Sequence, residues 1–399
     1  MTETAPLRRI LVVTPFYASH GDGVSRVAEK MIQELSADES LHFTWAASAC
    51  STLPRLAGQR ILPMRSGNWL EKLTGYAWPV WNPRSLLRLR RAVAEADIVW
   101  LHETFFFGNL LAFRWAKRLG KPTLVTQHTG LRPSRHPLSR QIRQMIDGCF
   151  VRPTLRAATQ TVFISDRIGE DYYRRTAFVR AVKIIPNGVE PRLYYPPMTE
   201  KRRYLRQQFA IRADQPVLLF VGRFSVNKGL PVIQKLAAML PGWRFWLAGK
   251  SPRHWRGINP AKWLLPNVHV FPYREGADLA ELYQAADMLI LPSYGEGFPL
   301  PIQEALACGL PVMCSPVTAS GSRDAQPLLH LVDVWPRDAQ RTATVWAEQL
   351  QNLAASLPLE QPQQALADFA HQTWSWQGIA EAYGEIFKEL TPPSQTETP

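Results

Sequence analysis

The sequence is poor in the features that mark several other protein classes. Cysteine occurs four times in 399 residues, and these positions form neither a CxxC pair nor a zinc-binding spacing: Cys50, Cys149, Cys308 and Cys314. This usage is typical of a reduced, cytoplasmic protein and argues against a small disulfide-stapled one. An Asp-x-Asp pair is also missing, so no short motif offers paired carboxylates to a divalent ion.

Long hydrophobic runs are missing as well. No apolar run approaches the roughly 18 residues that a helix needs to cross a bilayer. Near the N-terminus, two arginines precede a short apolar run over 10–13, which predicts a strand and not a signal peptide. The hydrophobic fraction of 46% and the charged fraction of 20% are ordinary for a soluble globular protein, and 399 residues suit two domains.

Acidic residues are outnumbered by basic ones in the first half of the chain only. Residues 1–195 contain 28 Lys and Arg against 15 Asp and Glu, whereas residues 196–399 contain 18 of each, so the first half holds the whole net charge of +13. Such asymmetry indicates contact with an anionic membrane surface, an acidic substrate or nucleic acid. Nucleic acid is the remote alternative, because no helix pattern combines a basic face with a defined recognition motif.

Short apolar runs alternate with helix-like patterns throughout, which is typical of doubly wound parallel α/β sheets. In the first half this pattern predicts helices over 24–35 and 109–119 and strands over 9–14, 42–47, 97–102, 123–127, 161–164 and 182–185. In the second half it predicts a helix over 278–286 and strands over 217–221, 244–247, 268–271 and 288–291. Ligands of such sheets bind beyond the carboxyl ends of the strands.

The stretch 292–312, PSYGEGFPLPIQEALACGLPV, is the most specific in the chain. Gly295 and Gly297 permit a sharp turn after the strand, and Gly309 is placed to end the following helix. A helix N-terminus after a glycine loop directs backbone N–H groups at an anion. Glu296 and Glu304, with seven residues between them, then suit sugar hydroxyls, which donate hydrogen bonds to carboxylates.

This stretch resembles the E-x7-E signature of the retaining glycosyltransferases of family 4, which have the GT-B fold. The resemblance implies that Glu304 binds the ribose of a nucleoside-diphosphate sugar and that Glu296 holds and orients the donor sugar. It is strongest from 217 to 312, and after Ser315 a glycine-rich segment of the family is replaced by 318–327.

Two further elements match the same family. Gly222 to Gly229, GRFSVNKG, resembles its G-R-x4-K-G element, in which Arg223 and Lys228 would neutralise a departing diphosphate without a metal. His128 directly follows a predicted strand, and the resemblance implies that it contacts the transferred sugar. We therefore expect catalytic roles for Glu296, His128, Arg223 and Lys228.

The same resemblance marks other donor-binding positions. Residues 21–26, GDGVSR, form half of a dinucleotide fingerprint, a weak signal by itself, and in the family this loop lies against the donor phosphates. Amides around Pro299 would serve the diphosphate, since proline has no N–H. The expected donor-binding residues besides Arg223, Lys228 and Glu304 are Gly23, Gly222, Gly249, Tyr273, Arg274, Gly297, Phe298 and Leu300.

The resemblance also predicts the domain organisation. Two Rossmann-like doubly wound domains would face a cleft: an acceptor-side domain over 1–195 and a donor-binding domain over 196–375. A C-terminal helix over 376–390 would return to the first domain, and 391–399 would be a disordered tail. The chain from Tyr194 to Arg206 is interpreted as a charged linker.

Two basic segments interrupt the α/β pattern of the first half. Residues 53–92 combine arginines with aromatic residues: Trp69, Tyr76, Trp78 and Trp81. Residues 131–156 are rich in arginine and hold a single acid, Asp147. Aromatic residues among arginines suit a membrane interface or an anionic acceptor, and the alternative is a solvated basic face above packed tryptophans.

Together these features predict a retaining hexosyltransferase. It would use a nucleoside-diphosphate sugar and a membrane-associated lipid-linked or glycan acceptor, in cell-surface polysaccharide or lipopolysaccharide synthesis. It would need neither metal nor organic cofactor and would lie peripherally on the inner face of the cytoplasmic membrane. The alternative is a soluble transferase of the same fold with a small phosphorylated acceptor, and a phosphorylase-like enzyme is disfavoured because no lysine is marked for pyridoxal phosphate.

Overall fold

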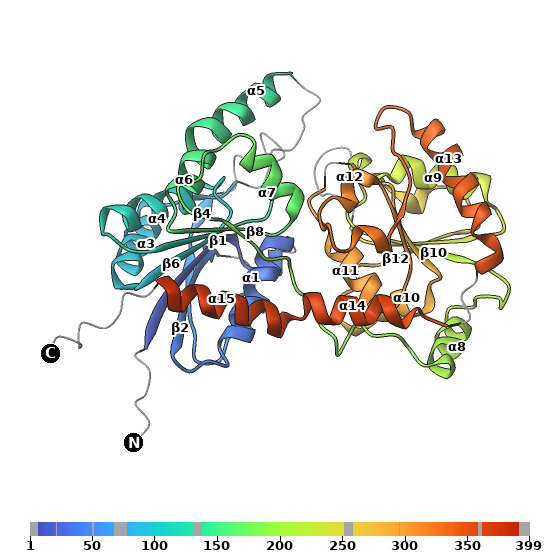
Figure 1. Cartoon of the computed structure of the whole chain (residues 1–399), viewed down its shortest axis with the longest axis horizontal. Helices are drawn as coiled ribbons and strands as arrows, with labels where there is room; N and C mark the ends of the chain where they lie inside the picture. Colours follow the sequence, from blue (N-terminus) through green and yellow to red (C-terminus); the bar gives the residue numbers. More distant parts are fainter. Residues whose placement is uncertain are drawn as a thin grey trace. The chain divides into compact units, whose positions relative to one another are not determined.

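The structure is a computed structural model that describes residues 7–20, 22–49, 52–67, 78–130, 137–250, 258–294, 296–357 and 361–390. Its contacts divide the chain into two compact units (Figure 1). Unit 1 comprises Met1–Asn187 with Trp376–Pro399, and unit 2 comprises Gly188–Ser375. Each unit has a parallel sheet with helices packed on it, so the predicted α/β class with two Rossmann-like domains is confirmed.

Unit 1 is built on a seven-stranded parallel sheet with the order β3-β2-β1-β6-β7-β8-β9. Its strands are β1 (Arg8–Phe16), β2 (Leu41–Ser48), β3 (Arg60–Met64), β6 (Ile98–His102), β7 (Thr123–Gln127), β8 (Gln160–Phe163) and β9 (Lys183–Ile184). Every residue of β6 and β7 is buried, as expected for central parallel strands that helices cover on both faces. A short antiparallel ribbon joins β4 (Ser66–Gly67) to β5 (Val80–Trp81).

The helices of unit 1 come from both ends of the chain. They are η1 (Ala18–His20), α1 (Gly23–Leu35), α3 (Pro83–Glu95), α4 (Phe107–Arg118), α5 (Pro137–Ile146), the π-helical turn η2 (Asp147–Val151), α6 (Arg152–Ala157), α7 (Asp166–Tyr173) and α15 (Trp376–Leu390). The C-terminal helix α15 packs against α1 (Figure 1). Its Tyr383 hydroxyl lies 3.0 Å from Thr126 Oγ1 of β7, which ties the end of the chain to the sheet.

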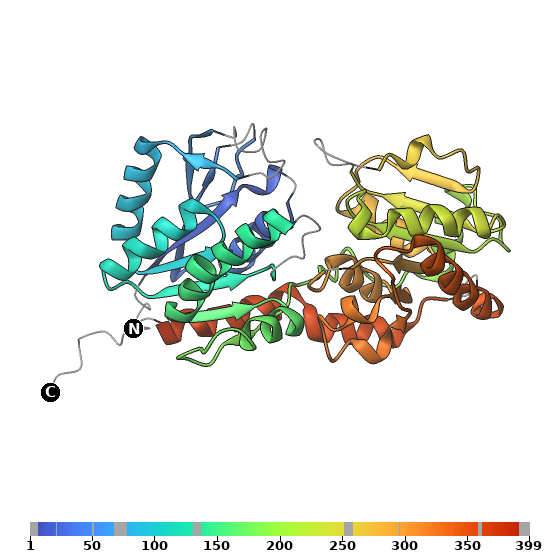
Figure 2. The same cartoon turned by 90° about the horizontal axis from the view of Figure 1, so that it is seen from above.

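Unit 2 has a six-stranded parallel sheet with the order β12-β11-β10-β13-β14-β15. The strands are β10 (Val217–Val221), β11 (Arg244–Ala248), β12 (Val268–Phe271), β13 (Met288–Leu291), β14 (Val312–Cys314) and β15 (His330–Leu331). The helices are α8 (Thr199–Gln208), η3 (Val226–Lys228), α9 (Leu230–Met239), η4 (Pro260–Lys262), α10 (Ala277–Ala285), α11 (Leu300–Ala307), α12 (Pro316–Ala319), η5 (Gln326–Leu328), α13 (Ala339–Asn352), η6 (Ala354–Ser356) and α14 (Gln364–Trp374). Helices α9 and α13 pack side by side (Figure 2).

The first passage of the chain from unit 1 into unit 2 lies at other residues than the sequence indicated. The first segment of unit 1 ends at Asn187, whereas the predicted first domain extends to Tyr195. Val189 N–H donates to the Trp374 carbonyl at 2.6 Å, and the ring of Tyr194 packs edge-on against Tyr283 at 5.8 Å. These contacts hold 188–195 in unit 2.

The predicted linker over 194–206 is wrong, because this segment is packed structure. Tyr194 is buried and 199–208 form α8. Arg202 and Arg206 of α8 both bind the buried carboxylate of Asp287, at 2.5 and 2.9 Å, and burial lowers the pKa of Arg202 to about 10. The charges that suggested a solvated linker are used inside unit 2.

The interpretation of 53–92 as an interruption is also wrong in part. Residues 60–64 form β3, which extends the sheet beside β2. Trp81 is buried: its Nε1 donates to Ser48 Oγ at 2.8 Å, and a Cβ on Gly108 would lie 2.6 Å from its ring. Trp78 stacks on Phe105 at 4.8 Å between ring centroids. Trp81 therefore packs in the core and does not serve a membrane interface. Two other aromatic residues of this segment lie outside the described residues: Trp69 and Tyr76.

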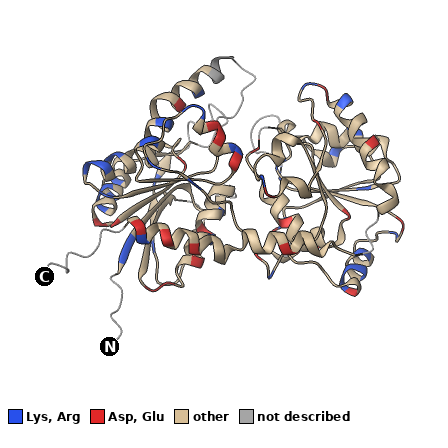
Figure 3. Cartoon of the chain, in the orientation of Figure 1, with Lys and Arg blue, Asp and Glu red and all other residues tan. Residues whose placement is uncertain are grey.

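Basic residues occur on several helices of unit 1 (Figure 3). Helix α3 exposes four of them: Arg84, Arg88, Arg90 and Arg91. Among the described residues, no helix is both long enough and apolar enough to span a bilayer.

Candidate active site

Most of the residues singled out from the sequence lie where three strands of unit 2 end. Strands β11, β10 and β13 are parallel neighbours, so their carboxyl ends share one edge of the sheet. The loops that follow them begin at Gly222, Gly249 and Pro292. This is the edge at which open α/β sheets bind their ligands.

Two glycines hold the loops after β10 and β11 together. A Cβ on Gly249 would lie 1.9 Å from the Gly222 carbonyl oxygen, and Gly222 has a φ of 154°. The Phe224 N–H donates to the Lys250 carbonyl at 3.0 Å. Gly249 thus needs glycine for the close approach of the two loops, and Gly222 needs it for its backbone conformation, which gives a structural reason for two residues expected to bind the donor.

A third glycine brings Lys228 and Glu296 together. Gly229 has a left-handed φ of 83°, and a Cβ there would lie 2.2 Å from the Pro292 carbonyl oxygen, so only glycine fits. The short helix η3, which ends at Lys228, is thereby held against the loop after β13. Lys228 Nζ lies 2.7 Å from Glu296 Oε1, and the side chains are 17% and 15% exposed. The sequence assigned them to different substrate groups, and the structure joins them in one ion pair.

Helix α11 begins directly beyond this ion pair. Pro299 caps it, Leu300 is its first residue, and Phe298 is buried against the Trp374 ring at 5.5 Å between centroids. A Cβ on Gly321 would lie 2.4 Å from the Gly297 carbonyl oxygen. Gly321 was missed from the sequence, because 318–327 was interpreted only as a departure from the family pattern.

A buried tyrosine of α10 donates a hydrogen bond to the carboxylate of Glu304. The Tyr283 hydroxyl of α10 donates to Glu304 Oε2 at 2.6 Å. Burial, together with the nearby Glu304 charge, raises the pKa of Tyr283 well above its usual value, so the phenol stays a donor. The sequence did not indicate Tyr283, which lies on the face of α10 that looks like ordinary core.

Of the remaining predicted residues of unit 2, Arg223 and Tyr273 are exposed and Arg274 is half-buried. Arg223 is exposed in the loop between Gly222 and Lys228. Tyr273 and Arg274 follow β12; Lys250 Nζ lies 3.4 Å from the centroid of the Tyr273 ring. The Arg274 guanidinium carbon is 5.2 Å from the Phe271 ring, and its buried Nε has no hydrogen-bond partner among the described residues.

His128 lies in unit 1, at the carboxyl end of β7, and contacts a second histidine. Its Nε2 is 3.0 Å from Nδ1 of His102, which ends the neighbouring strand β6. Burial lowers the pKa of His128 to about 3, and burial together with His128 lowers the pKa of His102 well below its usual value. Both rings are therefore neutral near pH 7, when they can exchange hydrogen bonds but do not serve as acids.

Glu103 completes this cluster and was missed from the sequence. It is buried with a φ of 72°, an uncommon conformation for a side chain of this size. Its Oε1 accepts from the His128 backbone N–H at 3.0 Å and its Oε2 from Gln127 Nε2 at 2.7 Å. Asn109 Nδ2 donates to the carbonyls of His102 and Glu103, both at 2.8 Å. The polar run His102-Glu103-Thr104 at the end of a buried strand was the available signal.

Gly23 is the remaining predicted residue of unit 1. It begins α1, whose cap Asp22 accepts the Ser25 N–H through Oδ1 at 2.9 Å. A Cβ on Gly23 would meet no atom within 4 Å, so the packing around the described residues does not require glycine. Gly21 lies outside the described residues.

The described residues offer no evident metal site. Among them, no group of three or more His, Cys, Asp or Glu side chains is placed to hold an ion. Cys308 and Cys314 are buried free thiols, and Cys149 is an exposed one.

Comparisons with known proteins agree with this architecture. The Glycosyltransferase Family 4 model matches residues 21–193, and the model of glycosyl transferases group 1 matches residues 201–324. The structure resembles sucrose-phosphate synthase from Thermosynechococcus elongatus, with a TM-score of 0.73, 20% identity, and coverage of 96% of this chain and 99% of that one. The fold is GT-B. Both halves of this GT-B chain thus match glycosyltransferase models.

Other similar proteins fit the same picture. Anabaena HepE in complex with UDP-glucose has a TM-score of 0.71 at 16% identity, covering 96% of this chain and 99% of that chain. In sequence, the chain is 32% identical over 238 residues to D-inositol 3-phosphate glycosyltransferase of Mycobacterium tuberculosis, which covers 55% of this chain and 47% of the relative. The match spans about half the length of such curated relatives.

Proposed function

We propose that the protein is a retaining hexosyltransferase that uses a nucleoside-diphosphate sugar and a membrane-associated lipid-linked or glycan acceptor. Its pathway would be cell-surface polysaccharide synthesis, of which lipopolysaccharide is one case. The observation that carries the proposal is the Lys228–Glu296 ion pair at the edge where β10 and β13 end, next to the N-terminus of α11. The complex of HepE with UDP-glucose supports the donor class.

The contacts of unit 2 support a division of labour on the donor. Departure of the diphosphate from an oxocarbenium-like centre sets the activation barrier of the proposed reaction. Fixed positive charge near the diphosphate should therefore lower this barrier more than any other contribution of the protein. Lys228, oriented by Glu296, and Arg223 would supply that charge. Glu296 keeps carboxylate lone pairs for sugar hydroxyls, and Glu304, anchored by Tyr283, would receive the ribose hydroxyls.

In unit 1, the neutral His128 would contact the transferred sugar. A neutral ring both donates and accepts, as a sugar hydroxyl does, so pairing needs no proton transfer. Glu296 and Glu304 are assigned to hydroxyls and to Lys228, and Glu103 accepts from Gln127 and from the His128 N–H, so none of these carboxylates is assigned as a nucleophile for double displacement. Attack on the face from which the diphosphate leaves then accounts for retention.

The reaction as proposed needs no metal and no organic cofactor. The cations Arg223 and Lys228 would act where many nucleotide-dependent enzymes place a divalent ion. The remaining donor contacts would come from Gly23, Gly222, Gly249, Tyr273, Arg274, Gly297, Phe298 and Leu300.

A membrane-associated acceptor is supported by the surface of unit 1. The helix formed by α5 and η2 exposes three apolar side chains: Ile142 at 46%, Met145 at 59% and Phe150 at 40%. Helix α5 projects from the rest of unit 1 (Figure 1), and α3 exposes a row of arginines. Apolar and basic side chains on one unit suit an anionic leaflet, so we place the protein peripherally at the inner face of the cytoplasmic membrane.

A soluble transferase with a small phosphorylated acceptor is the second candidate. The names of the relatives favour it, since they include a D-inositol 3-phosphate glycosyltransferase and a sucrose-phosphate synthase. In this case the arginines of unit 1 would bind the acceptor phosphate.

A screen of nucleotide sugars tests the common part of both candidates. The purified protein is incubated with each donor, and released nucleoside diphosphate is measured with and without acceptor. Release from none of the donors would contradict a glycosyltransferase. Once a donor is known, NMR of the product gives its anomeric configuration and so tests retention. Comparing the transfer rate to lipid-linked acceptors with the rate to phosphorylated soluble acceptors decides between the two candidates.

A further inference from the structure

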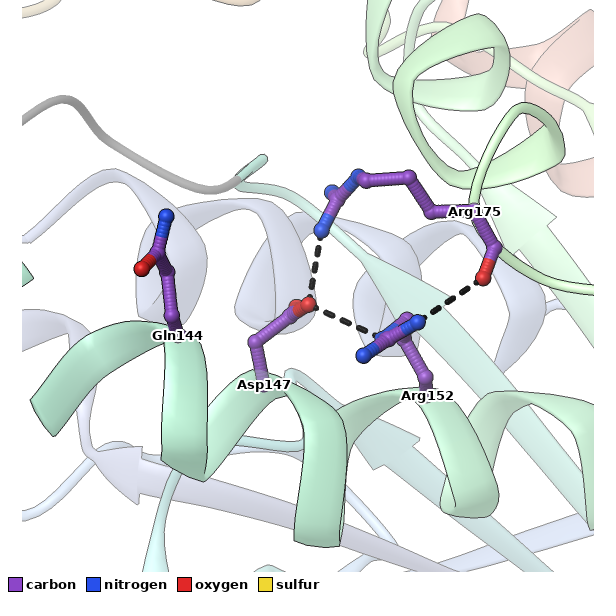
Figure 4. Close-up of a pocket in the computed structure, with 4 residues that line it drawn as sticks. All are labelled: Gln144, Asp147, Arg152 and Arg175. Atoms are coloured by element: carbon purple, nitrogen blue, oxygen red, sulfur yellow. Dashed lines mark hydrogen bonds and ion pairs between the residues drawn. The ribbon is translucent and has the colours of Figure 1, made fainter. Parts of the chain in front are cut away.

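A pocket of about 250 Å³ in unit 1 has no role in the site described above. It lies against the π-helical turn η2 and is lined by Gln144, Asp147, Arg152 and Arg175 (Figure 4). Single π-helical turns are rare and frequently occur at functional sites. This turn places the only acid of the arginine-rich segment 131–156 in the pocket.

The carboxylate of Asp147 is buried between two guanidinium groups. Arg175 Nη1 donates to Asp147 Oδ2 at 2.6 Å, and Arg152 Nε lies 3.2 Å from the same oxygen (Figure 4). Arg175 is also bound to Asp171, at 2.7 Å from Nη2 to Oδ2. The two arginines and two aspartates of this cluster therefore balance in charge, although Asp171 does not itself line the pocket.

One oxygen of this carboxylate is left over. Asp147 is 4% exposed, and its Oδ1 has no hydrogen-bond partner among the described residues. Arg152 Nη1 donates to the Arg175 carbonyl at 2.9 Å, while Nη2 lies beside Gly148, where a Cβ would come within 3.0 Å of it. A buried acceptor without a hydrogen bond costs free energy, so a ligand that donates a hydrogen bond to Oδ1 would be stabilised in the pocket.

We propose that this pocket binds a neutral polyhydroxylated ring, a sugar or polyol, through neighbouring hydroxyls. One hydroxyl donates to Asp147 Oδ1, and the next accepts from a guanidinium N–H of Arg152. A phosphate group does not suit the pocket, because Asp147 would repel it and both arginines already have anionic partners. An amine does not suit it either, because it would meet two guanidinium groups.

The pocket lies close to the strand end that holds His128. Gly130 follows His128 by two residues, and a Cβ on it would lie 3.3 Å from Asp171 Oδ2. Asp171 in turn holds Arg175. The bound ring is thus the sugar or polyol part of the acceptor; this role, unlike the binding itself, rests on the proposed function.

Saturation-transfer NMR with neutral probes, myo-inositol and methyl α-glucopyranoside, tests the binding on the full chain. Gln144 is exposed and lines the pocket, so Gln144→Trp blocks it without removing an ion pair. Gln141→Trp, three residues earlier on α5 and also exposed, is the matched control. We expect binding to weaken about ten-fold or more in Gln144→Trp and to stay unchanged in Gln141→Trp. Equal signals from both variants, or no signal from the unmodified protein, would overturn the proposal.

The same experiment with myo-inositol phosphate separates a hydroxyl site from an anion site. We expect the phosphate to add no affinity, and Asp147→Asn, checked for folding by circular dichroism, to weaken both ligands. Tighter binding of the phosphate that Asp147→Asn improves would overturn the proposal in favour of an anion site. Binding of nucleoside diphosphates, measured in parallel by calorimetry, reports on the donor site of unit 2. If a donor is bound and turned over but no polyol binds, the pocket assignment alone fails.

Discussion

At the scale of single residues, the site is held by a few contacts between segments far apart in sequence. Lys228 meets Glu296, Tyr283 meets Glu304, and Gly249 meets Gly222. Each contact fixes a side chain or loop that the proposed reaction needs. Substituting one residue of a contact should therefore change donor binding or donor turnover in a way that the contact predicts.

Lys228→Ala tests the charge that would stabilise the leaving diphosphate. We expect kcat/KM to fall by roughly 10²-fold or more, since this charge matters most as the diphosphate departs. Lys235→Ala is the control, because Lys235 donates to Gln340 and has no role in the site. A nearly normal rate for Lys228→Ala, in a variant with a normal circular dichroism spectrum, would remove Lys228 from the mechanism.

Glu304→Ala and Tyr283→Phe test the ribose assignment together. Glu304→Ala removes charge-assisted hydrogen bonds and should weaken donor binding by on the order of 2–4 kcal/mol. Tyr283→Phe keeps the carboxylate but removes the donor that orients it, so the loss should be smaller, about 1 kcal/mol. Calorimetric titration with the donor measures both. An unchanged dissociation constant in Glu304→Ala would rule out the ribose role.

Metal independence can be tested on the unmodified protein. If Arg223 and Lys228 neutralise the diphosphate, a chelator should leave the rate unchanged, and added magnesium or manganese should not raise it. Donor turnover before and after dialysis against the chelator provides the measurement. Activity that is lost on chelation and returns with either ion would contradict the assignment.

At the scale of elements, the sequence located several buried central strands well. The predicted bounds of β7, β10 and β13 coincide with the structure, because central parallel strands are continuous apolar runs between polar loops. The predicted bounds of β12 coincide as well, although β12 lies at an edge of its sheet and only its Phe271 is buried. Strands β3, β14 and β15 were not predicted: β3 and β15 each lie at one edge of their sheet, and β14 has only three residues. Their apolar signal is short, and pairing with a neighbour fixes them.

The missed site residues have a related explanation. His102 ends β6 and Glu103 follows it, but their roles depend on β7 lying beside β6, which a sequence does not display. In the same way, Arg202 was interpreted as part of a charged linker because its partner Asp287 is distant in the chain. Spacing within one segment predicted Glu296 and Glu304, whereas contacts between distant segments are visible only in the folded structure.

The contact between Gly229, which follows η3, and the loop after β13 leads to a prediction about stability. Gly229→Ala adds a Cβ at a left-handed φ and against the Pro292 carbonyl, so it should lower the free energy of unfolding by about 2 kcal/mol or more. Gly242→Ala is the matched control, since a Cβ there meets nothing within 4 Å. Urea unfolding measures both. Equal urea midpoints for the two variants would show that the close contact between Gly229 and the Pro292 carbonyl does not contribute to stability.

At the scale of the whole molecule, the basic surplus belongs to the first half of the chain, and no described helix spans a bilayer. Since Trp81 is buried, attachment to a membrane would rest on exposed arginines of α3 and on Ile142, Met145 and Phe150. Each basic side chain near an anionic leaflet contributes on the order of 1 kcal/mol. A handful of such contacts would give reversible binding that keeps the enzyme near a lipid-linked acceptor.

Vesicle sedimentation at two salt concentrations tests this attachment. We expect the protein to sediment with anionic and not with neutral vesicles at low salt, and to be released as the Debye length falls from about 10 Å at 0.1 M to about 3 Å at 1 M. Met145→Glu should reduce binding, because it adds a negative charge to the exposed apolar side of α5. Val179→Glu adds the same charge at another exposed apolar residue of unit 1, one that lies outside every helix, and should change binding little. Protein that stays in the supernatant with anionic vesicles at low salt would contradict the membrane assignment and favour the soluble, phosphorylated acceptor.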